Sequence, residues 1–114
     1  MPPAPTVLGE FETLLLLAVL HLTEDGRDAY GSAIREQIQT RTHRAVPRGS
    51  IYITLDRLEE KGFLVSREGS TTAARGHRPK RVFRIMPSGR RSVKMAVLTL
   101  TRMQRGLEDV LERA

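Results

Sequence analysis

An unbroken apolar run, from Leu14 to Leu20, is the feature that most constrains how this chain folds. It lies inside a longer helical pattern, in which apolar residues recur at spacings of three and four. The residues of that pattern are Leu8, Phe11, Leu15, Ala18, Val19 and Leu22. A helix that is apolar on every side must be covered on every side. Because a chain of 114 residues supplies little cover, we expect a second subunit to contribute, with Leu16 and Leu20 at the contact.

Positive charge is concentrated in the middle of the chain. The formal net charge is +6, and residues 41–91 carry thirteen basic residues against four acids, whereas residues 1–40 carry an excess of acids. Arginine makes up sixteen of the nineteen basic residues, and its planar guanidinium suits bidentate contacts to phosphate and guanine. Membrane surfaces and acidic proteins also attract such a segment, but nucleic acid is the favoured partner.

The composition argues against several other classes of protein. No apolar run reaches the roughly 18 residues of a membrane span, and the run that begins at Leu14 lacks a basic leader and a cleavage site. Cysteine is absent, which leaves no disulfide framework and no thiolate metal site. We therefore expect a cytoplasmic protein with no membrane association.

Catalytic and cofactor chemistry are not indicated either. The sequence holds no glycine-rich phosphate loop and no serine–histidine–aspartate arrangement. His21, His43 and His77 are scattered and have no carboxylates at ligand spacing, so we expect no metal and no other cofactor. Glu59 and Glu60 end a predicted helix and are expected to face water. An enzyme is therefore not expected.

Two shorter helices are predicted after the first. Asp28 is a good N-cap for a helix that continues to about Arg41. Val46 and Pro47 begin the next one, since proline fits the first helical position, and Gly62 is a natural stop for it. The expected core positions are Tyr30, Ala33, Ile34 and Ile38 in the earlier helix and Ile51, Leu55 and Leu58 in the later one.

A basic hairpin is predicted next. Residues 63–68 and 80–86 read as two short strands, because apolar and polar residues alternate in the second and small, polar residues fill the loop 69–79 between them. From Arg75 to Arg91 there are seven basic residues and no acid. We therefore expect the hairpin to carry a strong positive charge.

The last predicted helix begins at Pro87 and is expected to run nearly to the C-terminus. Its apolar residues repeat every seven positions, which is the a/d pattern of a coiled coil. They are Val93, Ala96, Leu100, Met103, Leu107 and Val110. We expect this helix to pair with its own copy in a homodimer; packing into an ordinary core of the same chain is the alternative.

This order of elements is that of a winged helix-turn-helix protein, an α+β fold that is mainly helical, with a long C-terminal dimerisation helix. We expect a flexible N-terminal arm at residues 1–7, a winged-helix DNA-binding domain at residues 8–86 and the dimerisation helix at residues 87–114. In such a domain the third helix enters a major groove, and the basic hairpin reaches a neighbouring backbone or minor groove.

Three segments resemble the PadR-like transcriptional regulators. Gly49–Gly62 resembles the recognition helix of that family, Asp28–Gly31 the start of its second helix, and Gly76–Ile85 its glycine- and arginine-rich wing. The resemblance covers about Leu8 to Arg91. It implies a dimeric repressor of the short branch of the family, and in ligand-sensing members a small-molecule inducer that binds near the dimer interface.

Two departures from the family pattern matter. Met86 stands where members often have a threonine that caps the final helix; the loss of such a cap costs about 1 kcal/mol and is partly offset by Pro87. The chain also has no Trp, and no aromatic residue follows Pro87, which argues against an inducer pocket built on aromatic stacking. The sequence does not identify an inducer.

We expect a sequence-specific regulator, a repressor that binds a pseudo-palindromic operator in double-stranded DNA as a homodimer. The alternative is a sequence-independent architectural or RNA-binding protein; an adaptor for other proteins would leave the basic segment unexplained. The predicted DNA-contacting residues are Arg48, Ser50, Tyr52, Ile53 and Arg57 on the third helix and Arg75, Arg78, Lys80 and Arg81 on the wing. Simpler roles stay open: packing for Tyr52, the helix start for Ser50, and solvated charge for Arg48 and Arg57.

Overall fold

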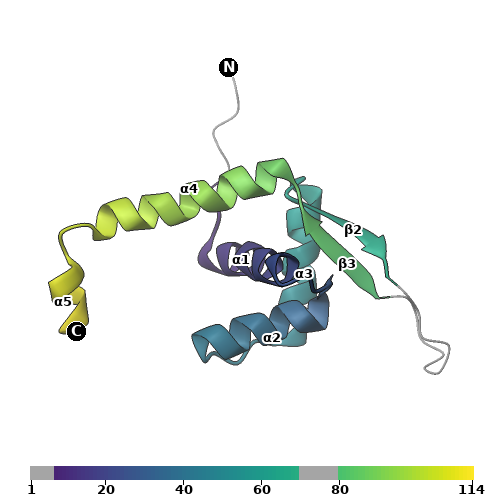
Figure 1. The fold of residues 1–114 in the computed structure, drawn as a ribbon, viewed down its shortest axis with the longest axis horizontal. Coiled ribbons are helices and arrows are strands. Elements are labelled where there is room, and N and C mark those ends of the chain that lie inside the picture. Colours follow the sequence, from purple (N-terminus) through teal and green to yellow (C-terminus); the bar gives the residue numbers. More distant parts are fainter. Residues whose placement is uncertain (1–6, 70–79) are drawn as a thin grey trace, which may run out of the picture.

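The computed structural model describes residues 7–69 and 80–114. Within them, five helices and three strands follow one another in an order typical of a winged helix (Figure 1). Their bounds are α1 Glu10–Glu24, β1 Ala29–Tyr30, α2 Gly31–Thr42, α3 Arg48–Glu60, β2 Leu64–Glu68, β3 Arg81–Ile85, α4 Pro87–Gln104 and α5 Glu108–Glu112. The predicted fold class, mainly helical α+β with a winged helix, is confirmed.

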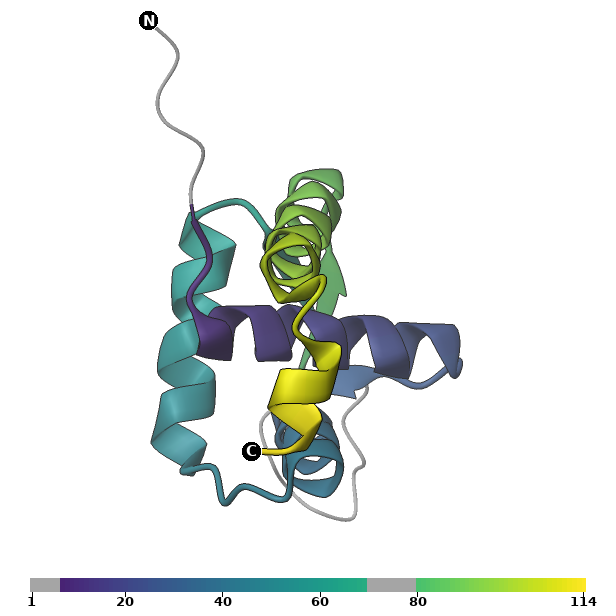
Figure 2. The same ribbon diagram turned by 90° about the vertical axis from the view of Figure 1, so that its left-hand side faces the viewer.

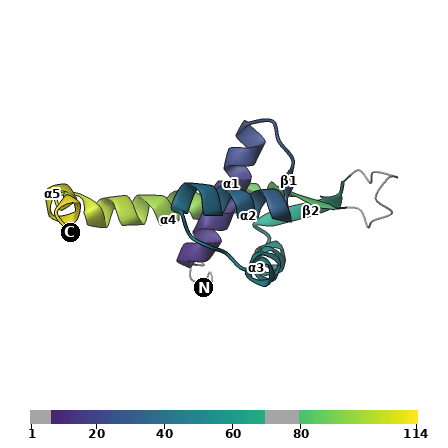
Figure 3. The same cartoon turned by 90° about the horizontal axis from the view of Figure 1, so that it is seen from below.

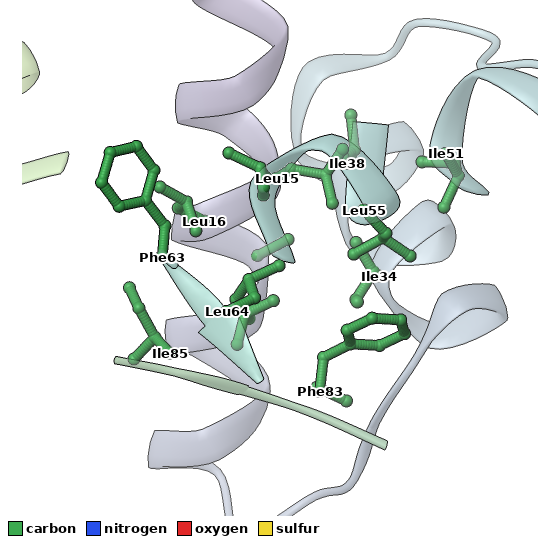
Figure 4. Close-up of a cluster of buried hydrophobic side chains, with 14 of the residues drawn as sticks. Leu15, Leu16, Ile34, Ile38, Ile51, Leu55, Phe63, Leu64, Phe83 and Ile85 are labelled. Carbon is green, nitrogen blue, oxygen red and sulfur yellow. The ribbon is translucent and has the colours of Figure 1, made fainter. Parts of the chain in front are cut away.

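Helix α1 lies at the centre of the fold. The helices α2, α3 and α4 lie around it (Figure 2), and strand β3 also contacts it. Leu15 and Leu16 point into a core that they share with Ile34, Leu55 and Phe83 (Figure 4). Helix α1 supplies four of the eight largest fully buried side chains, each of which contributes about 1.5–3 kcal/mol, so no other helix contributes more.

The expectation that α1 needs a second subunit for its cover is wrong for Leu16. This side chain is 0% exposed within the single chain, so it has no surface left for a partner. Leu14, Leu17 and Leu20 are partly buried against the same core. Elements far apart in the sequence, α4 and β3 among them, converge on α1 and cover much of it, while Leu14, Leu17 and Leu20 keep part of their surface exposed.

The three strands form one antiparallel sheet in the order β1–β3–β2. Strands β2 and β3 make the predicted hairpin, and β1 adds a two-residue edge that pairs Ala29 with Phe83. This edge was not predicted, because two residues are too few to show a periodicity. It also corrects the predicted cap: α2 begins at Gly31 after Tyr30, and Asp28 accepts a hydrogen bond from the Tyr30 hydroxyl at 3.2 Å.

Helix α3 has the core stripe that its sequence predicts. Ile51, Leu55 and Leu58 are buried, and Thr54 is buried beside them. The helix ends at Glu60, and Gly62, which follows the C-cap Lys61, has a φ of 78° in the left-handed region that favours glycine. This burial leaves the other side of α3 in solvent.

Helix α4 packs on the core only through its first half. Val93 is 4% exposed and Ala96 is partly buried against the core, and the C-terminal part of the helix projects away from the other helices (Figures 1 and 3). The prediction of one helix running nearly to the C-terminus is wrong, because α4 ends at Gln104 and the chain turns at Gly106, where φ is 91°, before α5. No helix in the described ranges is long and apolar enough to cross a bilayer.

Gly89 allows α4 to approach the turn between α3 and β2. A Cβ atom at this position would collide with the carbonyl oxygen of Phe63 and lie 2.9 Å from Cγ1 of Ile85. We expect Gly89→Ala to lower the free energy of unfolding by about 1–3 kcal/mol, as overpacking does elsewhere, measured by urea denaturation. Gly49→Ala is the matched control, since nothing lies within 4 Å of a Cβ there. Equal stability of the two variants would contradict the close approach.

Candidate nucleic-acid interface

The solvent side of α3 carries most of the residues predicted to read DNA. Tyr52 is 47% exposed and Ile53 is 60% exposed, and Arg48 and Arg57 are also exposed. The helical spacing of four places Arg48 beside Tyr52 and Ile53 beside Arg57, in two neighbouring stripes. Both stripes lie away from the buried stripe, so their side chains can contact a ligand without disturbing the core.

Ser50 stands apart from these residues. It is half-buried and lines a shallow hollow of about 270 Å³ with Phe11, Leu14 and the loop that joins α2 to α3. The structure thus places Ser50 beside α1 rather than beside Tyr52.

A cationic cleft of about 600 Å³ opens where the first turns of α2 and α3 meet the start of β3. Four basic side chains contribute to it, and no carboxylate belongs to its described lining. The lining residues are Tyr30, Gly31, Ser32, Arg35, Arg48, Ile51, Tyr52, Lys80 and Arg81. A cleft lined by one sign of charge concentrates ligands of the opposite sign.

Two contacts hold the α2 side of this cleft. The Nε of Arg35 donates a hydrogen bond to the carbonyl oxygen of Val46 at 2.6 Å, which ties α2 to the loop that leads into α3. Tyr52 lies against the start of α2, where a Cβ atom at Gly31 would be 2.7 Å from its Cε1. The absence of a side chain at Gly31 therefore makes room for the Tyr52 ring.

Lys80 brings the wing to the same cleft. Its Nζ lies 5.4 Å from the centroid of the Tyr30 ring, a cation–π distance. The hydrogen bond from the Tyr30 hydroxyl to Asp28 raises the pKa of Tyr30. Sequence reasoning missed both Arg35 and Tyr30 as cleft residues, because an isolated arginine and an isolated tyrosine carry no spacing signal.

Arg81, which the sequence predicts as a clamp on the DNA backbone, is paired with carboxylates of α3 in the structure. Its guanidinium donates to Asp56 at 2.9 Å and also to Glu59, and it lies 4.8 Å from the centroid of the Phe83 ring. The hydrogen bond to Asp56 contributes most to raising the pKa of Arg81. Glu59, expected to face water, is half-buried and also accepts a hydrogen bond from Ser66. The other two predicted wing contacts, Arg75 and Arg78, lie outside the described residues.

Apolar surface remains on the C-terminal helices. Val93 belongs to the core of its own chain, which corrects its predicted place in a seam between two copies, and Ala96 is partly buried against that core. The rest of the predicted seam is exposed, with Leu100 67% exposed. These exposed residues are Leu100, Met103, Leu107 and Val110.

Together, the helix-turn-helix, the small sheet and the cationic cleft define a winged-helix DNA-binding fold. A sequence model of the transcriptional regulator PadR-like family matches residues 19–95, so the chain belongs to this family, and the resemblance seen in the sequence is confirmed. No curated relative matches the chain by sequence.

Solved structures agree with this assignment. A transcriptional regulator of Thermoplasma acidophilum is 25% identical, with a TM-score of 0.67 over 87% of this chain and 90% of its own. A PadR family regulator of Clostridium difficile is 16% identical, with a TM-score of 0.68 over 90% of this chain and 99% of its own. The PadR protein of Bacillus subtilis, solved with operator DNA, is 15% identical, with a TM-score of 0.62 over 76% of this chain and 46% of its own.

Proposed function

We propose that this protein is a sequence-specific DNA-binding regulator that represses transcription as a homodimer on a pseudo-palindromic operator. The observation that carries the proposal is the exposed side of α3, where Ile53 and Arg57 lie in solvent and Arg48 and Tyr52 line a cationic cleft. The PadR protein of Bacillus subtilis, which shares the fold, was solved with operator DNA. A dimer that occupies a promoter represses it by excluding the polymerase.

The two stripes of α3 have different tasks in this proposal. Ile53 and Arg57 face the base edges of a major groove, since a recognition helix presents its outer side there. Arg48 and Tyr52, together with Arg35 and Lys80 across the cleft, hold the phosphate backbone beside that groove. Contacts to phosphate position the protein, whereas contacts to base edges select the sequence.

The dimer forms through the exposed apolar residues of α4 and α5. Leu100 and Met103 are exposed residues of the C-terminal half of α4, the part of the helix that projects away from the other helices (Figure 1). Several large apolar side chains exposed along one short stretch of chain are typical of an interface between subunits. Two copies joined there present two α3 helices, and a symmetric dimer reads two half-sites about 34 Å apart.

Selection of bound fragments from genomic DNA tests the proposal. We expect one pseudo-palindrome to be enriched and its affinity to fall steeply with salt. If each subunit neutralises about five phosphates, the log–log slope is about −9 for the dimer. Binding that is indifferent to sequence would favour the architectural alternative, and a slope near zero would mean that the cationic cleft does not face DNA.

Ile53 separates sequence reading from backbone binding. Ile53 is β-branched, apolar and 60% exposed, and contact with water does not stabilise such a side chain. Contact with a thymine methyl group would bury it and stabilise the complex with DNA. We expect Ile53→Ala to weaken binding to the selected operator by about 1 kcal/mol and to change binding to scrambled DNA little. Val65→Ala, which trims an exposed apolar residue of β2, is the control. An equal loss of affinity for the operator and for scrambled DNA, with the circular dichroism spectrum unchanged, would show that Ile53 does not contribute to sequence recognition.

Leu100 tests the dimer. Leu100→Lys places a charge against its own symmetry mate at an apolar contact, so we expect it to dissociate the dimer. Met95→Lys is the matched control, because Met95 is an exposed apolar residue of the same helix outside the predicted seam. Sedimentation at micromolar concentration measures both variants. A wild-type protein that sediments as a monomer would refute the dimer.

A further inference from the structure

Two carboxylates lie on the side of α3 that faces the wing. Asp56 follows Tyr52 by one helical turn, and Glu59 follows Asp56 by three residues, so all three share one side of the helix. The Asp56 side chain is 59% exposed. Unbalanced negative charge at this place opposes the approach of a phosphate backbone.

Arg81 is positioned to balance that charge. One of its terminal nitrogens, Nη1, donates to Oδ1 of Asp56 at 2.9 Å, and the other, Nη2, donates to Oε1 of Glu59. The Ser66 hydroxyl donates to Oε2 of Glu59 at 2.9 Å, and the buried Phe83 ring lies beside the guanidinium. These contacts come from three elements, so the guanidinium is held on several sides at once.

The same contacts anchor the base of the wing. In the sheet register Arg81 is paired with Glu68, and these are the outermost paired residues of β3 and β2. The residue just before Arg81 is Lys80, whose ammonium lies over the Tyr30 ring at the cationic cleft. Holding Arg81 against α3 therefore also limits where the backbone of Lys80 can lie.

We infer that Arg81 is a positioning residue: through Asp56 and Glu59 it fastens the wing to the recognition helix and neutralises the carboxylates of that helix. Its guanidinium is used for this purpose and does not serve as a phosphate contact. The inference rests on the proposed function, because it assigns Arg81 a place in the DNA-binding surface. It replaces the backbone clamp that the sequence predicted for this residue.

The two roles of Arg81 differ in how they depend on the carboxylates. If Arg81 acts through Asp56 and Glu59, replacing it should weaken DNA binding little once both carboxylates are neutralised. If Arg81 binds phosphate, replacing it should weaken DNA binding equally when the two carboxylates are neutralised. The magnitude of the salt slope should then fall by about 0.9 for each phosphate that is no longer neutralised.

A double-mutant cycle distinguishes the two roles. The variants are Arg81→Gln, the pair Asp56→Asn with Glu59→Gln, and all three changes together, each titrated on the selected operator at several salt concentrations. We expect Arg81→Gln alone to weaken binding about tenfold. In the neutralised background we expect Arg81→Gln to weaken binding less than about threefold and to leave the salt slope unchanged. The same loss in both backgrounds, with a shallower slope, would overturn the inference in favour of a phosphate contact.

Arg84→Gln is the matched control within the same strand. Arg84 is exposed and lines a hollow with Val65 and Arg67, on the sheet face opposite that of Arg81. We expect its replacement to weaken operator binding less than about threefold. A loss as large as that of Arg81→Gln would point to a general effect of net charge and would also overturn the inference.

Urea unfolding of the free proteins keeps this test separate from the proposed function. We expect Arg81→Gln to lower the unfolding midpoint in the wild-type background and to change it little when Asp56 and Glu59 are neutralised, because the partners of Arg81 are then uncharged. Equal shifts of the unfolding midpoint in both backgrounds would show that Arg81 does not stabilise the fold through Asp56 and Glu59. Failure of the wild-type protein to select DNA would refute the proposed function alone, since the unfolding cycle is measured without DNA.

Discussion

The burial of α1 by the rest of its own chain is the constraint on which the whole structure depends. Because α2, α3, α4 and β3 all pack on this helix, its apolar side chains set the relative placement of the recognition helix, the wing and the C-terminal helix. Leu15 and Leu16 are fully buried there, and truncation of such a residue to alanine typically costs about 2–5 kcal/mol. The orientation of α3, with its buried stripe inward, leaves the opposite side to solvent and to a ligand.

Weak interactions at the surface then adjust the positions of side chains on the recognition helix and the wing, whose overall placement the core sets. An exposed ion pair contributes about 0–1 kcal/mol to stability, so the contacts of Arg81 with Asp56 and Glu59 matter more for geometry and local charge than for the free energy of folding. The same holds for Lys80 over the Tyr30 ring. Around the cleft, the basic side chains come from α2, α3 and the start of β3, and no single element could supply them alone.

Several predictions from the sequence were right because they depend on local periodicity. The stripe Ile51–Leu58 predicted α3 and its buried side, and the alternation in residues 80–86 predicted the second strand of the hairpin. Other predictions failed where distant contacts decide. Leu16 and Val93 were assigned to a subunit interface, because a pattern shows that a residue must be buried but not which part of the molecule buries it. The turn at Gly106 divides the predicted last helix, although its heptad pattern continues to Val110.

The sequence by itself determined the helices of the core, the hairpin, the basic character of the central segment and the family. The helices, the hairpin and the basic character follow from side-chain chemistry and from spacing along one stretch of chain, and the family follows from the three segments that resemble it. Only the tertiary structure decided which charges are balanced and which stay free for a ligand. Arg81 and Lys80 are neighbours with similar charges in the sequence, yet the structure pairs Arg81 with two carboxylates of α3 and places Lys80 at the cationic cleft. The reason is that a charge is neutralised by the groups that folding brings within hydrogen-bond distance, and those groups lie more than twenty residues away in the chain.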